Sequence, residues 1–288
     1  MKFKSLYILF SVSLIFLLIT MILLPFFLPG SIYSLSSADL SVFLQIWELN
    51  WLIILIWFIL FTAVNVIFFK NRILYSLIEK ENWPALVRYL EEKIYKKGNY
   101  TSRLVNLLAY NYLLLSDASA VIILENKVNL AKPSLIDANP LIFGTARILA
   151  KDVSGALHFF ETHKINQGIK GGSAARDWMF FYHAFTMLLV HDHKNAGKEF
   201  TLLARMSRES LIMGLSSYFL QEILSLTVID KYQEWRDISY DARMKLREEL
   251  KDKNAWDKEV SIKSKDFHVA ALSKYTLKTG RWLYGYDS

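Results

Sequence analysis

Two long apolar stretches near the start of the chain constrain its fold more than any other feature. Residues 6–27 and residues 49–69 each contain no Asp, Glu, Lys or Arg, and nothing comparable recurs after residue 70. The hydrocarbon core of a bilayer is about 30 Å thick, and roughly 20 apolar residues of helix cross it. Both stretches reach that length. The sequence therefore predicts a transmembrane helical hairpin in residues 1–72, followed by a water-soluble region.

The charges around these stretches predict their orientation. Two lysines precede the first stretch and Lys70 and Arg72 follow the second, whereas the connection carries only acidic charges. Lys and Arg near span ends are retained in the cytoplasm. We expect a two-span inner or plasma membrane protein with both termini cytoplasmic. A cleaved signal peptide is the alternative, since residues 36–38 are small, but signal h-regions run about 7–15 residues.

Composition and motifs narrow the classes of function. The net charge is +7, but no sustained basic face suited to nucleic acid is present. The absence of cysteine excludes disulfides, zinc–thiolate sites and thiol nucleophiles. The cluster His191-Asp192-His193 is the most ligand-like, yet three consecutive residues on a turn do not converge on one ion. No HExxH, GxSxG, phosphate-loop or dinucleotide motif occurs. We expect no enzymatic activity, metal, cofactor or nucleic-acid partner.

The region after the hairpin reads as helices separated by short breaks. Apolar residues recur three and four apart, as a buried helical face requires, and the alternation typical of strands is largely missing. These patterns predict an all-α fold. Helices are expected at residues 104–115, 121–130, 141–150, 155–163, 178–190 and 196–206. The glycine-rich residues 168–172 are interpreted as a flexible connection between repeats.

The breaks between these helices recur with a period. Asp117, Asp152 and Asp192 are separated by 35 and 40 residues, and Asn82 lies 35 residues before the first of them. An aspartate at such a break accepts hydrogen bonds from the free amides of the next helix. Small residues at fixed offsets let paired helices approach closely. The positions that define the repeat are Ala109, Asp117, Gly144, Asp152, Ala156, Phe160, Ala184, Asp192, Ala196 and Phe200.

This pattern resembles the tetratricopeptide repeat (TPR) family, whose unit is a 34-residue helix–turn–helix. The best unit has the large–small pair, the turn aspartate, the small residue and the later aromatic of that family, at Phe143, Gly144, Asp152, Ala156 and Phe160. The chain departs from the family at Val121, Glu125, Arg147 and Met187. The resemblance covers about residues 73–206. It implies a solenoid of about three to four helix pairs.

The remaining residues are expected to close this solenoid. We divide the chain into the hairpin, a repeat domain at residues 73–229 that ends in a capping helix, and a charged helical region at residues 230–288. Residues 231–253 predict an amphipathic helix, because apolar residues recur at helical spacing: Tyr232, Trp235, Ile238, Ala242, Leu246 and Leu250. The aromatic end of the chain, residues 281–286, is expected to dock onto its own domain.

A solenoid presents an extended concave surface to partners. The TPR family holds peptides there, on the first helix of each pair. The corresponding candidates are Asn106, Tyr110, Asn111, Arg147, Phe181 and His183. The sequence thus predicts a membrane-anchored scaffold or adaptor within a larger assembly, in a layout that resembles HemY-type bacterial inner-membrane proteins. Two alternatives stay open: a homo-oligomeric component of a membrane machine, such as the collar of spirochaete flagellar motors, and an unrecognised membrane-bound enzyme.

Overall fold

The described part of the chain is mostly helical. A computed structural model describes residues 11, 14–15, 18–19, 40–170 and 173–285, and these contain no strand. The prediction of an all-α fold is therefore confirmed. The chain divides into two compact units, residues 1–89 and residues 90–288.

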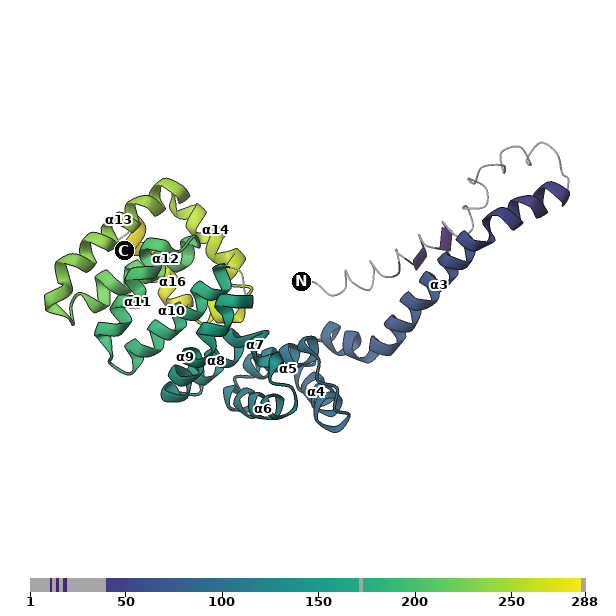
Figure 1. Ribbon diagram of the computed structural model, residues 1–288, viewed down its shortest axis with the longest axis horizontal. Coiled ribbons are helices and arrows are strands. Elements are labelled where there is room, and N and C mark those ends of the chain that lie inside the picture. Colours follow the sequence, from purple (N-terminus) through teal and green to yellow (C-terminus); the bar gives the residue numbers. More distant parts are fainter. Residues whose placement is uncertain (1–10, 12–13, 16–17, 20–39, 171–172, 286–288) are drawn as a thin grey trace. The chain divides into compact units, whose positions relative to one another are not determined.

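The first unit is dominated by one long helix, α3 (Leu40–Glu79), which is followed by the start of α4 (Trp83–Glu91) (Figure 1). At 1.5 Å per residue, its 40 residues span about 60 Å. Within the described residues, we find no helix that combines the length and the apolarity needed to cross a membrane. Most of residues 6–27, and several side chains of residues 49–69, lie outside the described part, as do residues 36–38. The two predicted spans therefore stay a prediction.

The second unit contains the helix pairs that the sequence predicts. Its first part consists of the π-helical turn η1 (Glu92–Lys96), α5 (Ser102–Leu114), α6 (Ala118–Ala131), α7 (Ser134–Asp137), α8 (Pro140–Leu149), α9 (Val153–Lys170), α10 (Ser173–Leu189), α11 (His193–Met206) and α12 (Ser210–Phe219). Each helix packs on the next, except that α6 contacts α8 across the short α7. This arrangement is solenoid-like (Figure 1). Residues 168–170 belong to α9, so the interpretation of the whole glycine-rich segment as a connection was wrong.

The breaks of the repeat share one backbone geometry. The residue before each capping Asn or Asp has a positive φ, between 51° and 65°: Glu81, Ser116, Lys151 and His191. The amide of each capping residue donates to the carbonyl five residues earlier, as in a Schellman motif. Its side chain accepts from the amide three residues later, over 3.0–3.3 Å. Asn82 shares this geometry, which confirms the break predicted before α4.

The small residues of the repeat lie where paired helices approach closely. Gly144 on α8 faces Phe160 on α9, and a Cβ atom at this glycine would lie 2.2 Å from the Phe160 ring. Ala109, Ala156 and Ala184 are fully buried. The other repeat-defining apolar residues, Phe160, Ala196 and Phe200, are also fully buried. The periodic positions predicted from the sequence are therefore core positions.

Substitution of Ala156 by leucine tests this register. The larger side chain should overpack the α8–α9 pair and lower the free energy of unfolding by about 1–3 kcal/mol. Ser154 is exposed on the same helix, so Ser154→Leu is a matched control that should stay within about 0.5 kcal/mol of wild type. Denaturant titration of the full-length chain measures both. Equal stability of the two variants would show that the register is wrong.

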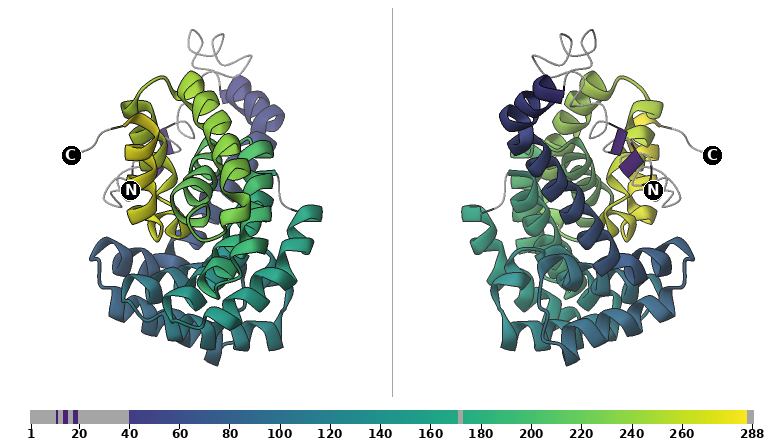
Figure 2. Two further views of the ribbon diagram at one scale, coloured as in Figure 1. Left: turned by 90° about the vertical axis from the view of Figure 1, so that its left-hand side faces the viewer. Right: turned by 90° about the vertical axis from the view of Figure 1, so that its right-hand side faces the viewer.

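Further helices follow the repeats: η2 (Leu220–Leu224), η3 (Ile229–Lys231), α13 (Tyr232–Leu250), α14 (Lys253–Lys263), α15 (Phe267–Ala270) and α16 (Ser273–Tyr284). The predicted amphipathic helix is confirmed, since α13 buries Trp235, Ile238, Ala242 and Leu246. Helix α16 packs on α12 and α13, and both views of Figure 2 show the yellow C-terminal helices beside the green ones. Trp282 lies against Tyr218 with 6.4 Å between ring centroids, which confirms the predicted docking of the aromatic end.

Candidate partner-binding face

The first helices of successive pairs, α5, α8, α10 and α12, form the face on which the TPR resemblance places partners. The structure brings the C-terminal segment of the same chain onto this face. Phe267 of α15 lies edge-on to Tyr110 of α5, with 6.2 Å between centroids, and α15 packs against α8. This pairing could not be predicted from the sequence, because 157 residues separate the two rings. We call Phe267–Trp282 the C-terminal strap.

The strap continues onto α10 through His268. Its ring lies 5.0 Å from that of Trp178, and the Tyr182 hydroxyl donates a hydrogen bond to the His268 carbonyl. Burial lowers the pKa of His268 to about 4, although nearby Asp266 acts in the opposite direction. The Nε2 atom is buried without a hydrogen-bond partner. His268 is therefore neutral at pH 7.

The last contacts of the strap are made on α10 and α12. The Tyr275 ring lies 5.7 Å from Phe185 and 5.0 Å from Phe219. Phe219 in turn stacks on Phe200 of α11 at 5.3 Å. Edge-to-face and offset aromatic pairs each add about 0.5–1.5 kcal/mol beyond area burial. The strap is thus held by aromatic contacts distributed along the first-helix face.

The structure separates five of the six candidate groove residues into an accessible group and a buried group. Tyr110 is 38% exposed, and Asn106 is half-buried on the same side of α5. Asn111 and Phe181 are buried, and His183 is 1% exposed. Phe181 packs in an aromatic cluster with Trp178 and Phe200. The buried residues have no free surface to offer a partner in this conformation.

Two of the candidates belong to charged networks between helices. Arg147 donates to both carboxylate oxygens of Glu125, over 2.9 and 3.0 Å, and to Asp152 over 2.7 Å. His183 Nδ1 lies 2.7 Å from Glu199, whose other oxygen accepts from Lys164 at 3.2 Å. These networks join α6 to α8 and α9 to α10 and α11. They satisfy side chains that would otherwise be buried without partners.

The part of the first-helix face that the strap leaves open lies on α5. Arg103, Asn106 and Tyr110 are spaced three and four apart and therefore share one side of that helix. Arg103 is exposed, and the Asn106 Oδ1 atom is buried without a hydrogen-bond partner. The exposed Arg103 guanidinium and the Tyr110 ring suit a polypeptide with acidic or aromatic side chains, whereas the buried Asn106 oxygen is not accessible to a partner. Arg103 was not among the sequence candidates, although its spacing from Asn106 could have identified it.

The ligand-like cluster His191-Asp192-His193 lies at the break before α11. Within the described part of the chain, no three His, Asp or Glu side chains are grouped to hold a metal ion. At the break before α11, Asp192 caps the helix through the Asn195 amide. The rings of His191 and His193 lie 5.7 Å apart.

Stability should depend on pH through His268. In the unfolded chain a histidine titrates near pH 6.5, whereas the pKa of His268 is lowered to about 4 by burial. Between these values the unfolded state binds more protons, so acidification destabilises the fold, by about 2 kcal/mol from pH 7.5 to pH 5. Denaturant titrations at both pH values measure this loss. His268→Gln should shrink it, whereas substitution of the exposed His158 should not.

The fold and this face define a class, an all-α protein of stacked helix pairs closed by its own C-terminal segment. Residues 120–285 match the family described as "Uncharacterised Treponema protein", and the chain belongs to this family. A protein of Treponema pallidum (strain Nichols), also described as uncharacterized, is 32% identical to this chain over 170 residues. That match covers 59% of this chain and 53% of the relative, so it spans about half the relative's length. No solved structure matches the chain.

Proposed function

We propose that this chain is a membrane-anchored adaptor whose TPR-like repeat region binds another protein on the cytoplasmic side. One observation carries the proposal. The first-helix face already holds a polypeptide segment, the C-terminal strap, through ring contacts and a backbone hydrogen bond from Tyr182. A face with this chemistry suits a second segment of the same kind. The protein has no catalytic role in this proposal.

The partner binds beside Phe267, where the strap begins, on the open part of α5. Tyr110 offers an exposed ring edge beside Phe267. Arg103 supplies an exposed cation on the same side of the helix, and Asn106 lies half-buried between Arg103 and Tyr110. A partner segment that lies next to the strap on α5 therefore contacts polar and aromatic side chains that share one side of this helix. Asn106 and Tyr110 are the sequence candidates that remain in this site.

The anchor in this proposal is the N-terminal hairpin of residues 6–27 and 49–69. Its support is the uncharged length of both stretches and the basic residues that flank them. Confining the repeat region to a membrane raises the local concentration of a partner that is held at the same membrane. The adaptor thus acts through position and geometry.

Affinity capture of the tagged full-length chain from native membranes, followed by crosslinking and mass spectrometry, tests the proposal. We expect a stoichiometric partner that crosslinks near α5 and that is lost from Tyr110→Ala. Leu130 is 89% exposed on the neighbouring helix α6, so Leu130→Ala is the matched control and should retain the partner. Equal capture by both variants would refute the α5 site. Recovery of the wild-type chain in the soluble fraction would refute the anchor.

A homo-oligomeric component of a membrane machine is the second candidate. The family description names Treponema, a spirochaete genus, and the collar of spirochaete flagellar motors is rich in helical repeats of this kind. The same crosslinking experiment separates the two functions. Crosslinks between copies of this chain, in place of a second protein, would favour the structural component.

A further inference from the structure

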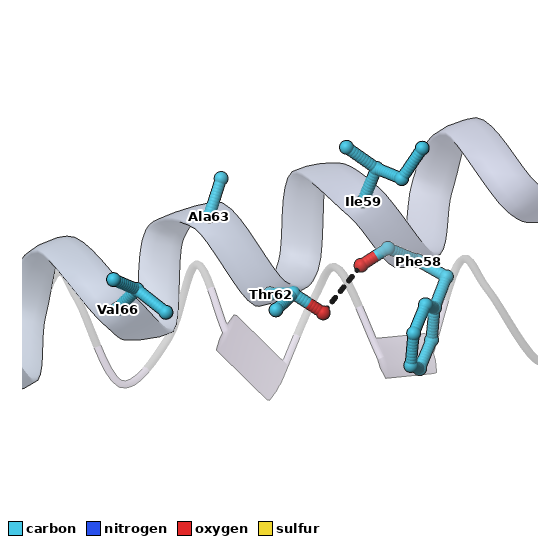
Figure 3. A pocket seen from close by; sticks show the side chains of 5 residues that line it. All are labelled: Phe58, Ile59, Thr62, Ala63 and Val66. Atoms are coloured by element: carbon cyan, nitrogen blue, oxygen red, sulfur yellow. Dashed lines mark hydrogen bonds between the residues drawn. The ribbon is translucent and has the colours of Figure 1, made fainter.

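Helix α3 carries an apolar groove that does not define a ligand. Figure 3 shows the residues that line it: Phe58, Ile59, Thr62, Ala63 and Val66. The Thr62 hydroxyl donates to the Phe58 carbonyl over 2.8 Å, so the groove offers no free polar side chain to an occupant. A pair of arginines on α13 differs from this groove, because its charges define the chemistry of what it binds.

Arg243 and Arg247 lie one turn apart on α13 and contact the end of α16. Their Nε atoms both donate to the Leu283 carbonyl, over 3.1 and 2.7 Å. Leu283 lies in the last turn of α16, where the carbonyls have no partner within the helix and attract cations. The Arg243 guanidinium also lies over the Trp282 ring, 5.3 Å from its centroid. Both guanidiniums are therefore held next to one another.

The outer ends of both guanidiniums have no hydrogen-bond partner in the described part of the chain. Each bond to Leu283 uses Nε alone, which leaves the two Nη nitrogens of Arg243 and those of Arg247. Both arginines are half-buried, but none of these nitrogens is buried. They can therefore reach a ligand from solvent. Paired guanidinium nitrogens match the spacing of oxygens in a carboxylate or a phosphate.

Other half-buried cations of the second unit are neutralised by carboxylates. Arg147, Lys164 and Lys263 each have a carboxylate oxygen within 3.2 Å. Among the described residues, no carboxylate forms an ion pair with Arg243 or with Arg247. Capping of α16 explains why one arginine lies at Leu283. It does not explain why a second cation lies beside the first without a counter-charge.

The two positive charges disfavour one another. Burial lowers the pKa of Arg243, and the neighbouring charge of Arg247 lowers that pKa further. Glu222 on η2 and Tyr240 on α13 act in the opposite direction but do not cancel these effects. An anion bound beside the pair would stabilise both cations.

We propose that Arg243 and Arg247 bind a phosphate group, either free or carried by a phospholipid. A phosphate monoester has about −1.5 to −2 charge at pH 7 and three acceptor oxygens. It thus balances both arginines, whereas a carboxylate balances one. Tyr240 is 59% exposed and lies three residues before Arg243, on the same side of α13. The site is distinct from the α5 face, so it does not depend on the adaptor role.

Calorimetric titration of the purified full-length chain, in a neutral detergent and at constant ionic strength, tests the site with two probes. Inorganic phosphate represents the free group. Dioctanoyl phosphatidic acid represents the headgroup, with dioctanoyl phosphatidylcholine as its zwitterionic reference. Saturable binding of inorganic phosphate supports a site for the free group, and saturable binding of phosphatidic acid alone supports a site for the headgroup. Saturable binding of neither probe would overturn the proposal.

Substitution of the two arginines locates the binding. Arg243→Gln and Arg247→Gln should each weaken it on the order of tenfold, because each removes charge-assisted hydrogen bonds. Arg236 lies on the same helix and donates to the Tyr232 hydroxyl over 2.8 Å. Arg236→Gln is therefore the matched control and should bind as the wild type does. Equal binding by all three variants would overturn the proposal.

A third substitution separates a phosphate site from a helix cap. Glu222 is exposed on η2, so Glu222→Gln leaves the cap of α16 intact and removes the acidic charge that opposes a bound anion. We expect this variant to bind phosphate about twofold more tightly. Unchanged or weaker binding would count against the site. If the arginine variants lost thermal stability while the wild type bound neither probe, the pair would act only as a cap.

Discussion

Replacing Trp256 by alanine is expected to lower the free energy of unfolding by about 3–5 kcal/mol. Trp256 on α14 is 1% exposed and fills a slot between α12 and α16. A Cβ atom at Gly214 or at Gly280 would lie 2.8 Å from the indole, so both helices approach it as closely as backbone allows. The indole Nε1 donates to the Thr276 carbonyl over 3.3 Å. Alanine would leave a cavity and remove this hydrogen bond.

Denaturant titration of the full-length chain measures this loss. Leu277 lies on α16 and is 54% exposed, so Leu277→Ala should change stability by less than about 0.5 kcal/mol. Most of α16 belongs to the C-terminal strap. The loss of the Trp256 side chain should therefore also weaken the contacts that the strap makes with α10 and α12. Increased proteolysis after residue 264 in Trp256→Ala, and not in the control, would report this. If the Trp256→Ala and Leu277→Ala variants were equally stable, Trp256 would not be an essential packing residue between α12 and α16.

The repeat was predictable because its signals are local. Asp117, Asp152 and Asp192 cap helices that begin at the next residue, and the backbone before them turns through a positive φ. Capping and close approach depend on residues within one turn or one helix pair. The spacing in the sequence therefore predicts them, and every predicted helix overlaps an observed one, although α9 ends seven residues later and α10 begins five residues earlier than predicted.

The binding face was less predictable because it depends on contacts between distant residues. Phe181 and His183 were expected on a free concave surface, but α10 is covered by α9, α11, α12 and the strap. The repeat period predicts that a residue lies on the first helix of a pair, but it does not predict which other elements cover that residue. Arg103 shows the converse, since the spacing places it on the exposed side of α5 and no repeat position marks it.

Departures from the TPR pattern had a physical reason that the sequence did not reveal. Glu125 stands where the family has an aromatic residue, and Arg147 where it has a tyrosine. In the structure these two residues pair with each other, so one charged substitution compensates for the other. In the next unit the aromatic position is filled by Phe160, which stacks on Tyr182 at 5.4 Å. The same repeat position thus forms an ion pair between α6 and α8 and an aromatic stack between α9 and α10.

Removing the cation of this pair should produce the second large effect. Arg147→Met leaves Glu125, which is 8% exposed, without its partner and removes a bond from Asp152. Breaking a buried ion pair from one side costs about 3–5 kcal/mol, because the remaining charge stays buried. Burial lowers the pKa of Arg147, but the hydrogen bonds that its guanidinium donates to Glu125 and Asp152 outweigh this effect and raise that pKa, so the guanidinium is charged. Thermal and denaturant unfolding measure the loss.

A double variant distinguishes the pair from its individual charges. Arg147→Met combined with Glu125→Leu removes both buried charges, and apolar replacement of a buried pair is often neutral or stabilising. We therefore expect the double variant to recover most of the stability lost by Arg147→Met. Lys97 pairs with Glu92 at 3.6 Å and both are exposed, so Lys97→Met should change stability by less than about 1 kcal/mol. If Arg147→Met behaved like Lys97→Met, the α6–α8 contact would not depend on this ion pair, and packing around Phe143 and Val121 would have to hold the two helices together.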